Sequence, residues 1–203
     1  MKKKVIVDLC GGTGEWSKPY RKAGYQVMIV DIKRGLNVLD LYTQNSLVEM
    51  RPYGILAAPP CPMLSFARTN AKAKRDLKGA MEIVNGCMQI IWKCQYNLKS
   101  DTQKVSPLKF WTLENPNGML KWFLGKPVFE FNPYDFGDNY KKRTQLWGWF
   151  NEPKKNPIKC TKPKFDKMPT KEIHTKYYGK LTRQERRAIT PEGFAKAFFL
   201  ANR

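Results

Sequence analysis

The chain has 203 residues, 42% of them hydrophobic, which is enough for one substantial core and marginal for two. Its 37 Lys and Arg residues outnumber 17 Asp and Glu residues, and the net charge of +20 favours a polyanionic partner such as nucleic acid over a merely basic soluble protein. No apolar run approaches the roughly 20 residues that span a bilayer, so no membrane anchor is expected.

The N-terminal sequence and the cysteines indicate in which cellular compartment the protein is expected. The opening MKKKVIVDLCGG imitates a signal peptide, but its apolar stretch is too short and lacks a cleavage site. The five cysteines are scattered, and the one histidine, His174, lies far along the chain from four of them. Neither a disulfide framework nor a metal site is expected, and we expect a monomer in a reducing cytoplasm.

The first half of the chain alternates apolar, β-rich runs with amphipathic stretches. Strands are predicted at Lys4–Leu9, Gln26–Asp31, Tyr53–Ala58 and Phe110–Glu114. Helices are predicted at Ser17–Ala23, Thr43–Met50 and Lys72–Leu98. This alternation predicts an α/β fold with a mostly parallel, twisted sheet and helices on both faces.

The second half of the chain differs in character. Val128–Phe136 and Gln145–Phe150 are predicted to form a final strand pair, whereas residues 151–187 are rich in Lys and Pro and too basic for a core. That basic stretch is either a solvated linker or a surface that faces DNA. Near the end, Thr190 is a predicted N-cap and Pro191 the first residue of a short packed helix.

Three glycines follow the first strand in the turn Asp8–Ser17, DLCGGTGEWS. Glycines between a strand and a helix let the backbone approach a ligand closely, and the missing Gly-Lys-Ser/Thr disfavours a triphosphate. Asp31 ends the second strand, where a carboxylate can accept hydrogen bonds from a ribose diol, and Asp40 could face an adenine amino group. Either aspartate could instead cap a helix.

Two more motifs end apolar strands. Cys61 stands between prolines in Ala57–Phe66 (AAPPCPMLSF), so it is stiffly presented at the edge where α/β sheets bind ligands. Glu114 ends the strand FWTLE and Asn115 follows it. An acid at the end of so apolar a run needs an interacting partner or a chemical role, although Asn115 could also cap a helix. The other cysteines are expected to be packing or surface residues, namely Cys10, Cys87, Cys94 and Cys160.

Taken in chain order, DLCGGTGEW, PPCPMLSF and LENPNG resemble the cofactor loop, the nucleophile motif and the catalytic glutamate of the DNA cytosine-5 methyltransferase family. FNPYDFGDNYKKRTQLWG resembles the strand and the arginine-bearing loop that follow in that family. The resemblance covers residues 4–150. It implies a Rossmann-like, S-adenosylmethionine-dependent methyltransferase fold.

The resemblance also implies roles for individual residues. The catalytic set is Cys61, Glu114, Asn115 and Arg143. S-adenosylmethionine, which leaves as S-adenosylhomocysteine, is expected to contact Asp8, Cys10, Gly11, Gly12, Thr13, Gly14, Trp16, Asp31, Ile32, Asp40, Leu41 and Pro60. DNA is the expected partner, with contacts from Ser65, Arg68, Lys72, Lys74, Arg75, Lys141 and Lys142.

The chain departs from the family pattern at several positions. Cys10 and Glu15 replace a phenylalanine and the last glycine of the cofactor loop, Pro116 replaces a valine, and Lys141 and Gln145 replace a glutamine and an arginine. The large target-recognition segment and a clear Gly-Asn-Ser motif are missing. These departures put the target sequence in doubt more than the chemistry, and the small size favours a viral or mobile-element enzyme.

The expected organisation therefore has three parts. These are a catalytic, cofactor-binding core over residues 1–150, a reduced basic DNA-contact segment over residues 151–189 and a helix over residues 190–203 that packs on the core.

The implied chemistry is covalent, because cytosine C5 is too weakly nucleophilic to take a methyl group directly. The Cys61 thiolate adds to C6, Glu114 shares a proton with N3 through a raised carboxyl pKa, and Arg143 holds the O2 side. The target base has to leave the duplex, and the segment Pro62–Arg75 is expected to close over it.

Three alternatives stay open. The substrate could be cytosine in RNA or in a nucleotide, although enzymes that act on RNA commonly carry a second cysteine near the site. An amino-methyltransferase would need Asp/Asn-Pro-Pro-aromatic where this chain has Ala-Pro-Pro-Cys. A catalytically inactive DNA-binding homologue is the alternative from another class, but a binder has no need of Cys61, Glu114 and Arg143 together.

Overall fold

A six-stranded sheet forms the centre of the protein, whose computed structural model describes residues 3–68, 72–96 and 108–203. The strands are β1 (Val5–Leu9), β2 (Gln26–Val30), β3 (Gly54–Ala57), β4 (Phe110–Pro116), β5 (Phe129–Phe131) and β6 (Thr144–Trp149). They lie in the order β2-β1-β3-β4-β6-β5. The first four strands are parallel, and β6 runs antiparallel to both β4 and β5.

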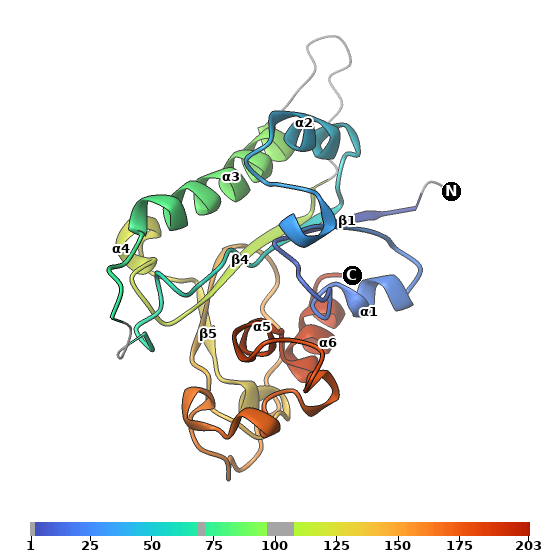
Figure 1. Ribbon diagram of the computed structural model, residues 1–203. Helices are drawn as coiled ribbons and strands as arrows, with labels where there is room; N and C mark the ends of the chain where they lie inside the picture. Colours follow the sequence, from blue (N-terminus) through green and yellow to red (C-terminus); the bar gives the residue numbers. More distant parts are fainter. Residues whose placement is uncertain (1–2, 69–71, 97–107) are drawn as a thin grey trace.

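Helices cover both faces of the sheet (Figure 1). They are α1 (Lys18–Lys22), α2 (Leu41–Glu49), α3 (Leu77–Tyr96), α4 (Lys121–Leu124), α5 (Arg183–Ala188) and α6 (Glu192–Ala201). Val7 and Ile55 face α2 and α3, whereas their neighbours Ile6 and Leu56 face α1 and α6. The predicted α/β fold, with a largely parallel sheet between helices, is confirmed. Within the described ranges no helix is long and apolar enough to cross a membrane.

The register of the parallel strands fixes where their carboxyl ends lie. Leu9 of β1 pairs with Ala57 of β3, and Ala57 pairs with Leu113 of β4. The segments that carry the glycine turn, Cys61 and Glu114 therefore leave the sheet at one level. The chain runs from β1 outward to β2 and then returns to β3 on the other side, so the strand order reverses between β1 and β3.

Two predicted elements are shorter in the structure, each for a local reason. The strand expected over residues 128–136 ends at Phe131, because Asn132 caps a 3-10 turn, η2 (Pro133–Phe136), through a reciprocal capping box with Asp135. Helix α3 begins at Leu77 and not at residue 72. The Asp76 carboxylate accepts the Gly79 amide (2.8 Å) and so starts the helix. The expected last two residues of this helix lie outside the described residues.

The expectation of a solvated linker is wrong for residues 165–188, here called the basic lobe. Phe165, Met168 and Ile173 form a small core beside Tyr140, whose ring stacks on Phe165 at 4.8 Å. The lobe contains the 3-10 turns η3 (Phe165–Lys167), η4 (Thr170–Glu172) and η5 (Thr175–Tyr177), followed by α5.

Arginine side chains hold the basic lobe together from within. Arg186 is buried and donates to the carbonyl oxygens of Thr170 (2.5 Å) and Ile173 (3.0 Å). Arg183 donates to the carbonyl oxygen of Met168 (3.1 Å). The guanidinium groups of these arginines are thus hydrogen-bonded to backbone carbonyl oxygens. These bonds explain how a stretch that is too basic for a core can still be ordered.

The C-terminal helix α6 packs on the sheet through aromatic rings. Phe194 is fully buried, stacks on Phe131 with ring centroids 4.0 Å apart, and contacts Trp16 at 5.8 Å. The cap differs from the expected one, because Pro191 occupies the N-cap position, one residue after Thr190, and makes no side-chain cap.

Phe194→Ala should lower the free energy of unfolding by about 3–5 kcal/mol, because the ring leaves a cavity among packed aromatics. Leu200→Ala is the matched control on the same helix. Leu200 is 52% exposed, so we expect a change within about 0.5 kcal/mol. Urea denaturation measures both, and equal effects would contradict the described packing of α6.

Candidate active site

The glycine turn after β1 is built on a buried aspartate. Asp8 accepts a hydrogen bond from the Ser17 hydroxyl (2.5 Å), and burial raises its pKa to about 6 although that hydrogen bond opposes the rise. A Cβ on Gly11 would lie 2.5 Å from the Asp8 carboxyl carbon, so only glycine fits there. Gly12 and Gly14 have φ of 49° and 74°, which glycine adopts readily. Asp8 thus supports the turn from beneath.

Asp31 joins the end of β2 to the glycine turn. Its carboxylate accepts the Gly12 amide (2.9 Å) and the Lys33 amide (3.0 Å), and the second bond caps the 3-10 turn η1 (Ile32–Arg34). Asp40 accepts the Thr43 amide (2.7 Å) and caps α2. Both aspartates are therefore caps, the alternative that the sequence left open, and Asp31 also reaches the predicted cofactor turn.

The other residues expected at the cofactor differ in exposure. Ile32 (76%) and Leu41 (66%) leave most of their apolar surface open, and Pro60 is exposed. Cys10 and Thr13 are half-buried in the turn. Trp16 is 2% exposed and packs against α6, so the structure places it in the core.

A side-chain and a backbone hydrogen bond join the Cys61 loop to β4 and to the residues that follow it. The side-chain amide of Asn115 donates to the Pro59 carbonyl (3.0 Å), so Asn115 is a strand residue that ties two loops and not a helix cap. Further along, the Met119 amide donates to the Leu64 carbonyl (2.8 Å). A Cβ on Gly118 would lie 2.2 Å from the same oxygen, so this close approach needs glycine.

The side chains of Cys61 and Glu114 are half-buried, and the charge of Glu114 affects the pKa of Cys61. Burial raises the pKa of the Cys61 thiol, Lys142 opposes the rise and Glu114 adds to it. Burial also raises the pKa of Glu114, again opposed by Lys142, as its expected proton-sharing role requires. The net effect is a raised pKa of Cys61, whereas the addition to C6 expected of this residue needs the thiolate.

Arg143, expected beside the nucleophile, is engaged elsewhere. Its guanidinium forms an ion pair with Glu130 of β5 (2.5 Å), and Gln145 donates to the same carboxylate (2.6 Å). Lys142, expected at DNA, is the neighbour whose charge acts on Cys61 and Glu114. We did not predict from the sequence that Lys142, and not Arg143, acts on Cys61 and Glu114. A strand extended back from Leu146 would have placed Lys142 on the same face as Leu146.

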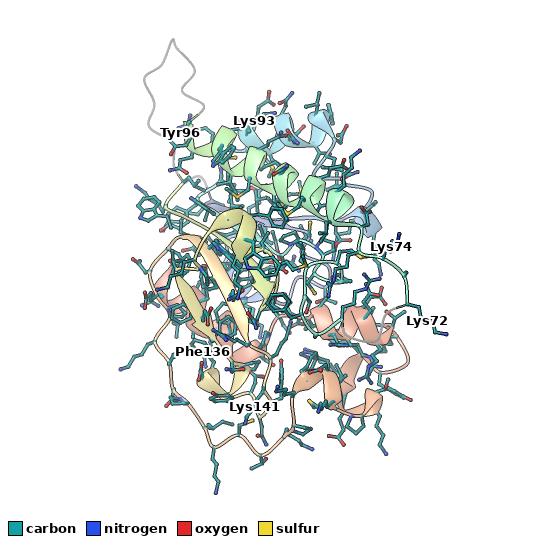
Figure 2. The ribbon with its side chains drawn as sticks, turned by 90° about the vertical axis from the view of Figure 1, so that its left-hand side faces the viewer. Lys72, Lys74, Lys93, Tyr96, Phe136 and Lys141 are labelled. Atoms are coloured by element: carbon teal, nitrogen blue, oxygen red, sulfur yellow. The ribbon has the colours of Figure 1, made fainter. Side chains whose placement is uncertain are left out.

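The segment after Cys61 carries two kinds of cation. Arg75 donates to the carbonyl oxygens of Met63 (2.6 Å), Ser65 (3.0 Å) and Arg68, while Arg68 donates back to Ala73 (3.1 Å). These arginines therefore hold the segment in shape and are not displayed for phosphates. In contrast, the expected DNA contacts Lys72, Lys74 and Lys141 are exposed (Figure 2). Residues 69–71 lie outside the described residues.

Glu15, which follows the third glycine of the turn, fastens the basic lobe to the glycine turn. Its carboxylate accepts hydrogen bonds from the Tyr177 hydroxyl (2.5 Å), from Lys176 (3.3 Å) and from Lys18 (3.0 Å). Burial alone would raise the pKa of Glu15, but these three donors lower it. The lobe is anchored a second time where Lys33 pairs with Glu185 of α5.

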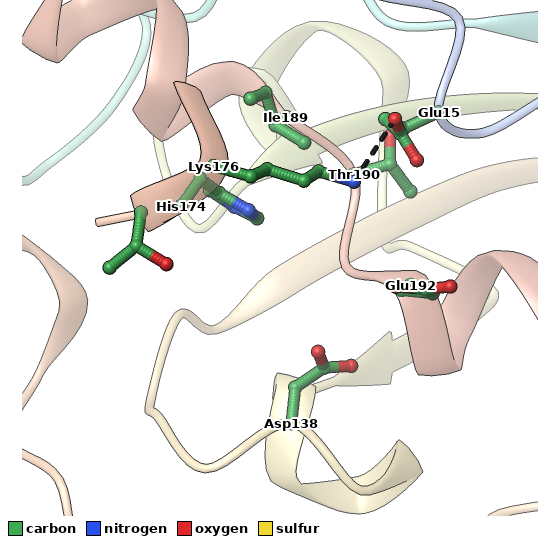
Figure 3. Close-up of a pocket in the computed structure, with 8 residues that line it drawn as sticks. Glu15, Asp138, His174, Lys176, Ile189, Thr190 and Glu192 are labelled. Carbon is green, nitrogen blue, oxygen red and sulfur yellow. Dashed lines mark hydrogen bonds and ion pairs between the residues drawn. The ribbon is translucent and has the colours of Figure 1, made fainter. Parts of the chain in front are cut away.

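A cavity of about 200 Å³ lies where the glycine turn, the basic lobe and the start of α6 meet (Figure 3). It is lined by Glu15, Asp138, His174, Thr175, Lys176, Ile189, Thr190 and Glu192. Burial, with help from Lys142 and Lys176, lowers the pKa of His174 to about 4, so this imidazole is neutral near neutral pH. The sequence offered one missed signal for the basic lobe, the Thr182-x-x-Glu185 capping box that begins α5.

Comparison with known proteins adds little to this geometry. No protein-family model matches the chain, and no curated protein matches its sequence. Among solved structures it is similar to the methyltransferase EhMeth of Entamoeba histolytica, with a TM-score of 0.45 and 12% identity. That likeness covers 78% of this chain, which spans 58% of the other. The case for a function therefore rests on the residues described above.

Glu15→Gln should loosen the basic lobe, because a neutral amide accepts weaker hydrogen bonds from Lys176 and Tyr177 than a carboxylate does. We expect faster proteolytic cleavage within residues 174–180, with Glu192→Gln on the same cavity as the control. Since the folded pKa of Glu15 is lowered, its contribution is present above the usual glutamate pKa and is lost as the pH falls through the folded value. Cleavage that is insensitive to both acid and Glu15→Gln would contradict the anchoring role.

Proposed function

We propose that this protein is an S-adenosylmethionine-dependent methyltransferase with a Rossmann-like fold that acts on C5 of cytosine in DNA. The observation that carries the proposal is the joining of the Cys61 loop to the Glu114 strand end, beside the glycine turn. Open α/β sheets bind ligands outside the carboxyl ends of their strands, where the strand order reverses. Here that place lies between β1 and β3.

The residues at this edge fit the cofactor. A Cβ built on Gly12 meets only the Asp31 carboxylate, at 3.9 Å, so the backbone there is open to a ligand. Each oxygen of Asp31 accepts one backbone amide and has a lone pair left for a ribose hydroxyl. Ile32 and Leu41 offer exposed apolar surface. Bound at this edge, S-adenosylmethionine supplies the electrophilic methyl group.

Cys61 and Glu114 act on the base. The sulfur of Cys61 forms a bond to C6 after the thiol proton has left for water, and the C5–C6 electron pair becomes available at C5. Glu114, whose pKa burial raises, gives a proton to N3 as negative charge reaches the ring. Once C5 is methylated, loss of its hydrogen as a proton to water restores the C5–C6 double bond and releases the thiolate, and the N3 proton returns to Glu114.

Charge and aromatic surface beside this loop support a nucleic-acid partner. Lys72 and Lys74 are exposed on the segment that follows Cys61. Phe66 and Trp122 form an exposed aromatic pair with ring centroids 5.6 Å apart, and Lys121 lies over the Phe66 ring at 5.3 Å. Exposed rings among cations suit unstacked bases and phosphates.

An oligonucleotide containing 5-fluorocytosine should become covalently attached to Cys61 in the presence of S-adenosylmethionine. Fluorine at C5 leaves no proton to remove, so the sulfur–C6 bond persists. Intact-protein mass spectrometry should show one oligonucleotide per chain for the native protein and for Cys160→Ala, a half-buried control cysteine. We expect none for Cys61→Ala.

Three outcomes would change the assignment. Attachment that survives Cys61→Ala would remove Cys61 as the nucleophile. Attachment to an RNA oligonucleotide and not to DNA of the same sequence would keep the chemistry and move the substrate to RNA. A protein that binds DNA and gives no adduct would instead be the inactive DNA-binding homologue.

The double variant Lys72→Gln/Lys74→Gln should reduce the slope of log affinity against log salt by about 1.8 on duplex DNA, because each phosphate contact contributes about 0.9. The control is Lys22→Gln/Lys109→Gln, which removes two exposed lysines away from the Cys61 loop. Fluorescence anisotropy at several salt concentrations measures both slopes. Equal slopes for the two variants would place the phosphate contacts elsewhere.

A further inference from the structure

The pairing of β4 with β6 decides which cation shares a face with the proposed catalytic pair. Glu114 lies directly opposite Leu146 in the antiparallel register, and Asn115 lies opposite Gln145. Directly opposed residues point to the same side, and side chains alternate along a strand. The ladder continues past β6, since the Asn117 amide donates to the Arg143 carbonyl (2.9 Å). Counting back by twos from Leu146 therefore places Lys142 on the Glu114 face.

The same count places Arg143 on the opposite face. Its side chain lies with Gln145 and Glu130, which are opposed in the pairing of β5 with β6. The observed contacts agree with the register, because both Arg143 and Gln145 bind the Glu130 carboxylate. Arg143 would have to break a two-point ion pair and cross the sheet to reach Glu114.

Lys142 is held in place by the basic lobe. Its ammonium donates to the Arg187 carbonyl (3.1 Å) at the end of α5 and lies 5.9 Å from the centre of the Phe165 ring. The Thr144 hydroxyl donates to the Lys142 carbonyl (2.9 Å) and steadies its backbone. One bond to a neutral carbonyl leaves two ammonium hydrogens for other acceptors.

We propose that Lys142, and not Arg143, is the cation of the reaction site: it stabilises the Cys61 thiolate and the negative charge that addition of sulfur to C6 places on the pyrimidine. The inference rests on the proposed function and deepens it, because it identifies the residue that offsets the charge of this step. Ordering of the basic lobe thereby becomes a condition for catalysis, since the lobe positions the ammonium through Arg187 and Phe165.

The charges around Cys61 make the proposal measurable without a substrate. Lys142 and Arg187 act to lower the thiol pKa, from the approach to β6 and from α5, while burial and Glu114 of β4 act to raise it. His174 also lies within the influence of Lys142, but its lowered pKa keeps it neutral above about pH 5. Removing the ammonium leaves burial and Glu114 less opposed, so the thiol should ionise at higher pH.

The test is the pH dependence of Cys61 alkylation by iodoacetamide, followed on the Cys61 peptide by mass spectrometry so that the other four cysteines do not interfere. Lys142→Met should move the midpoint upward by about one pH unit. Lys142→Arg should restore it, and Arg143→Met should leave it unchanged. Circular dichroism of each variant checks that the fold is retained.

Three results would overturn the proposal. These are an unchanged midpoint in Lys142→Met, an equal rise in Arg143→Met, and a rise in Lys142→Arg, which would assign the effect to the shape of the lysine and not to its charge. Alkylation needs neither DNA nor cofactor, so it stays informative if methyl transfer to DNA is never seen. In a protein that does methylate DNA, Lys142→Met should also slow turnover at neutral pH by about tenfold, in line with the one-unit shift.

Discussion

The common level at which β1, β3 and β4 end is the constraint on which the site depends. Leu9, Ala57 and Leu113 are aligned by parallel pairing, so the glycine turn, the Cys61 loop and Glu114 emerge side by side although they are far apart in sequence. Backbone hydrogen bonds alone do not fix this alignment. A slip of one residue in the register would turn every side chain of the strand to the other face of the sheet. Buried valine, isoleucine and leucine on both faces of these strands hold that register.

A second layer of contacts then closes the site from the basic lobe. The Glu15 carboxylate binds Lys176 and Tyr177, and the Arg187 carbonyl binds Lys142, so the lobe is attached both at the glycine turn and beside the start of β6. A small core around Phe165 and arginines bound to carbonyl oxygens order the lobe although it is rich in charge. Its other cations can act on the site and on a polyanion. A half-buried thiol of raised pKa depends on the positive charge of the neighbouring lysine to form the thiolate.

Much of the fold could be predicted from the chain because its signals are local. Val5–Val7 and Gly54–Ala57 are apolar runs in central strands that are buried on both faces, and Val27–Val30 is an apolar run in the edge strand β2. The glycine turn is dictated by the Asp8 carboxylate beneath Gly11. The catalytic motifs could be placed at one sheet edge for the same reason. The end of the predicted strand at Phe131 was missed because a capping box at Asn132 outweighs the apolar pattern that follows it.

What could not be predicted depends on contacts between distant segments. The order of the basic lobe rests on arginine bonds to carbonyls of residues 13 to 16 positions away, which produce no hydrophobic periodicity. The exchange of Lys142 for Arg143 depends on strand parity and on Glu130, a residue with no signal of its own in the sequence. Trp16, which we expected to contact the cofactor, packs against Phe194 and Phe198 near the C-terminal end of the sequence.

The central claim is methyl transfer to cytosine C5, and nucleoside analysis tests it most directly. The protein is incubated with S-adenosylmethionine labelled in the methyl group and with DNA of mixed sequence, and the DNA is then digested and its nucleosides are separated. We expect label in 5-methylcytosine and in no other nucleoside. Label on an exocyclic amino group, or DNA that is bound and stays unlabelled, would contradict it.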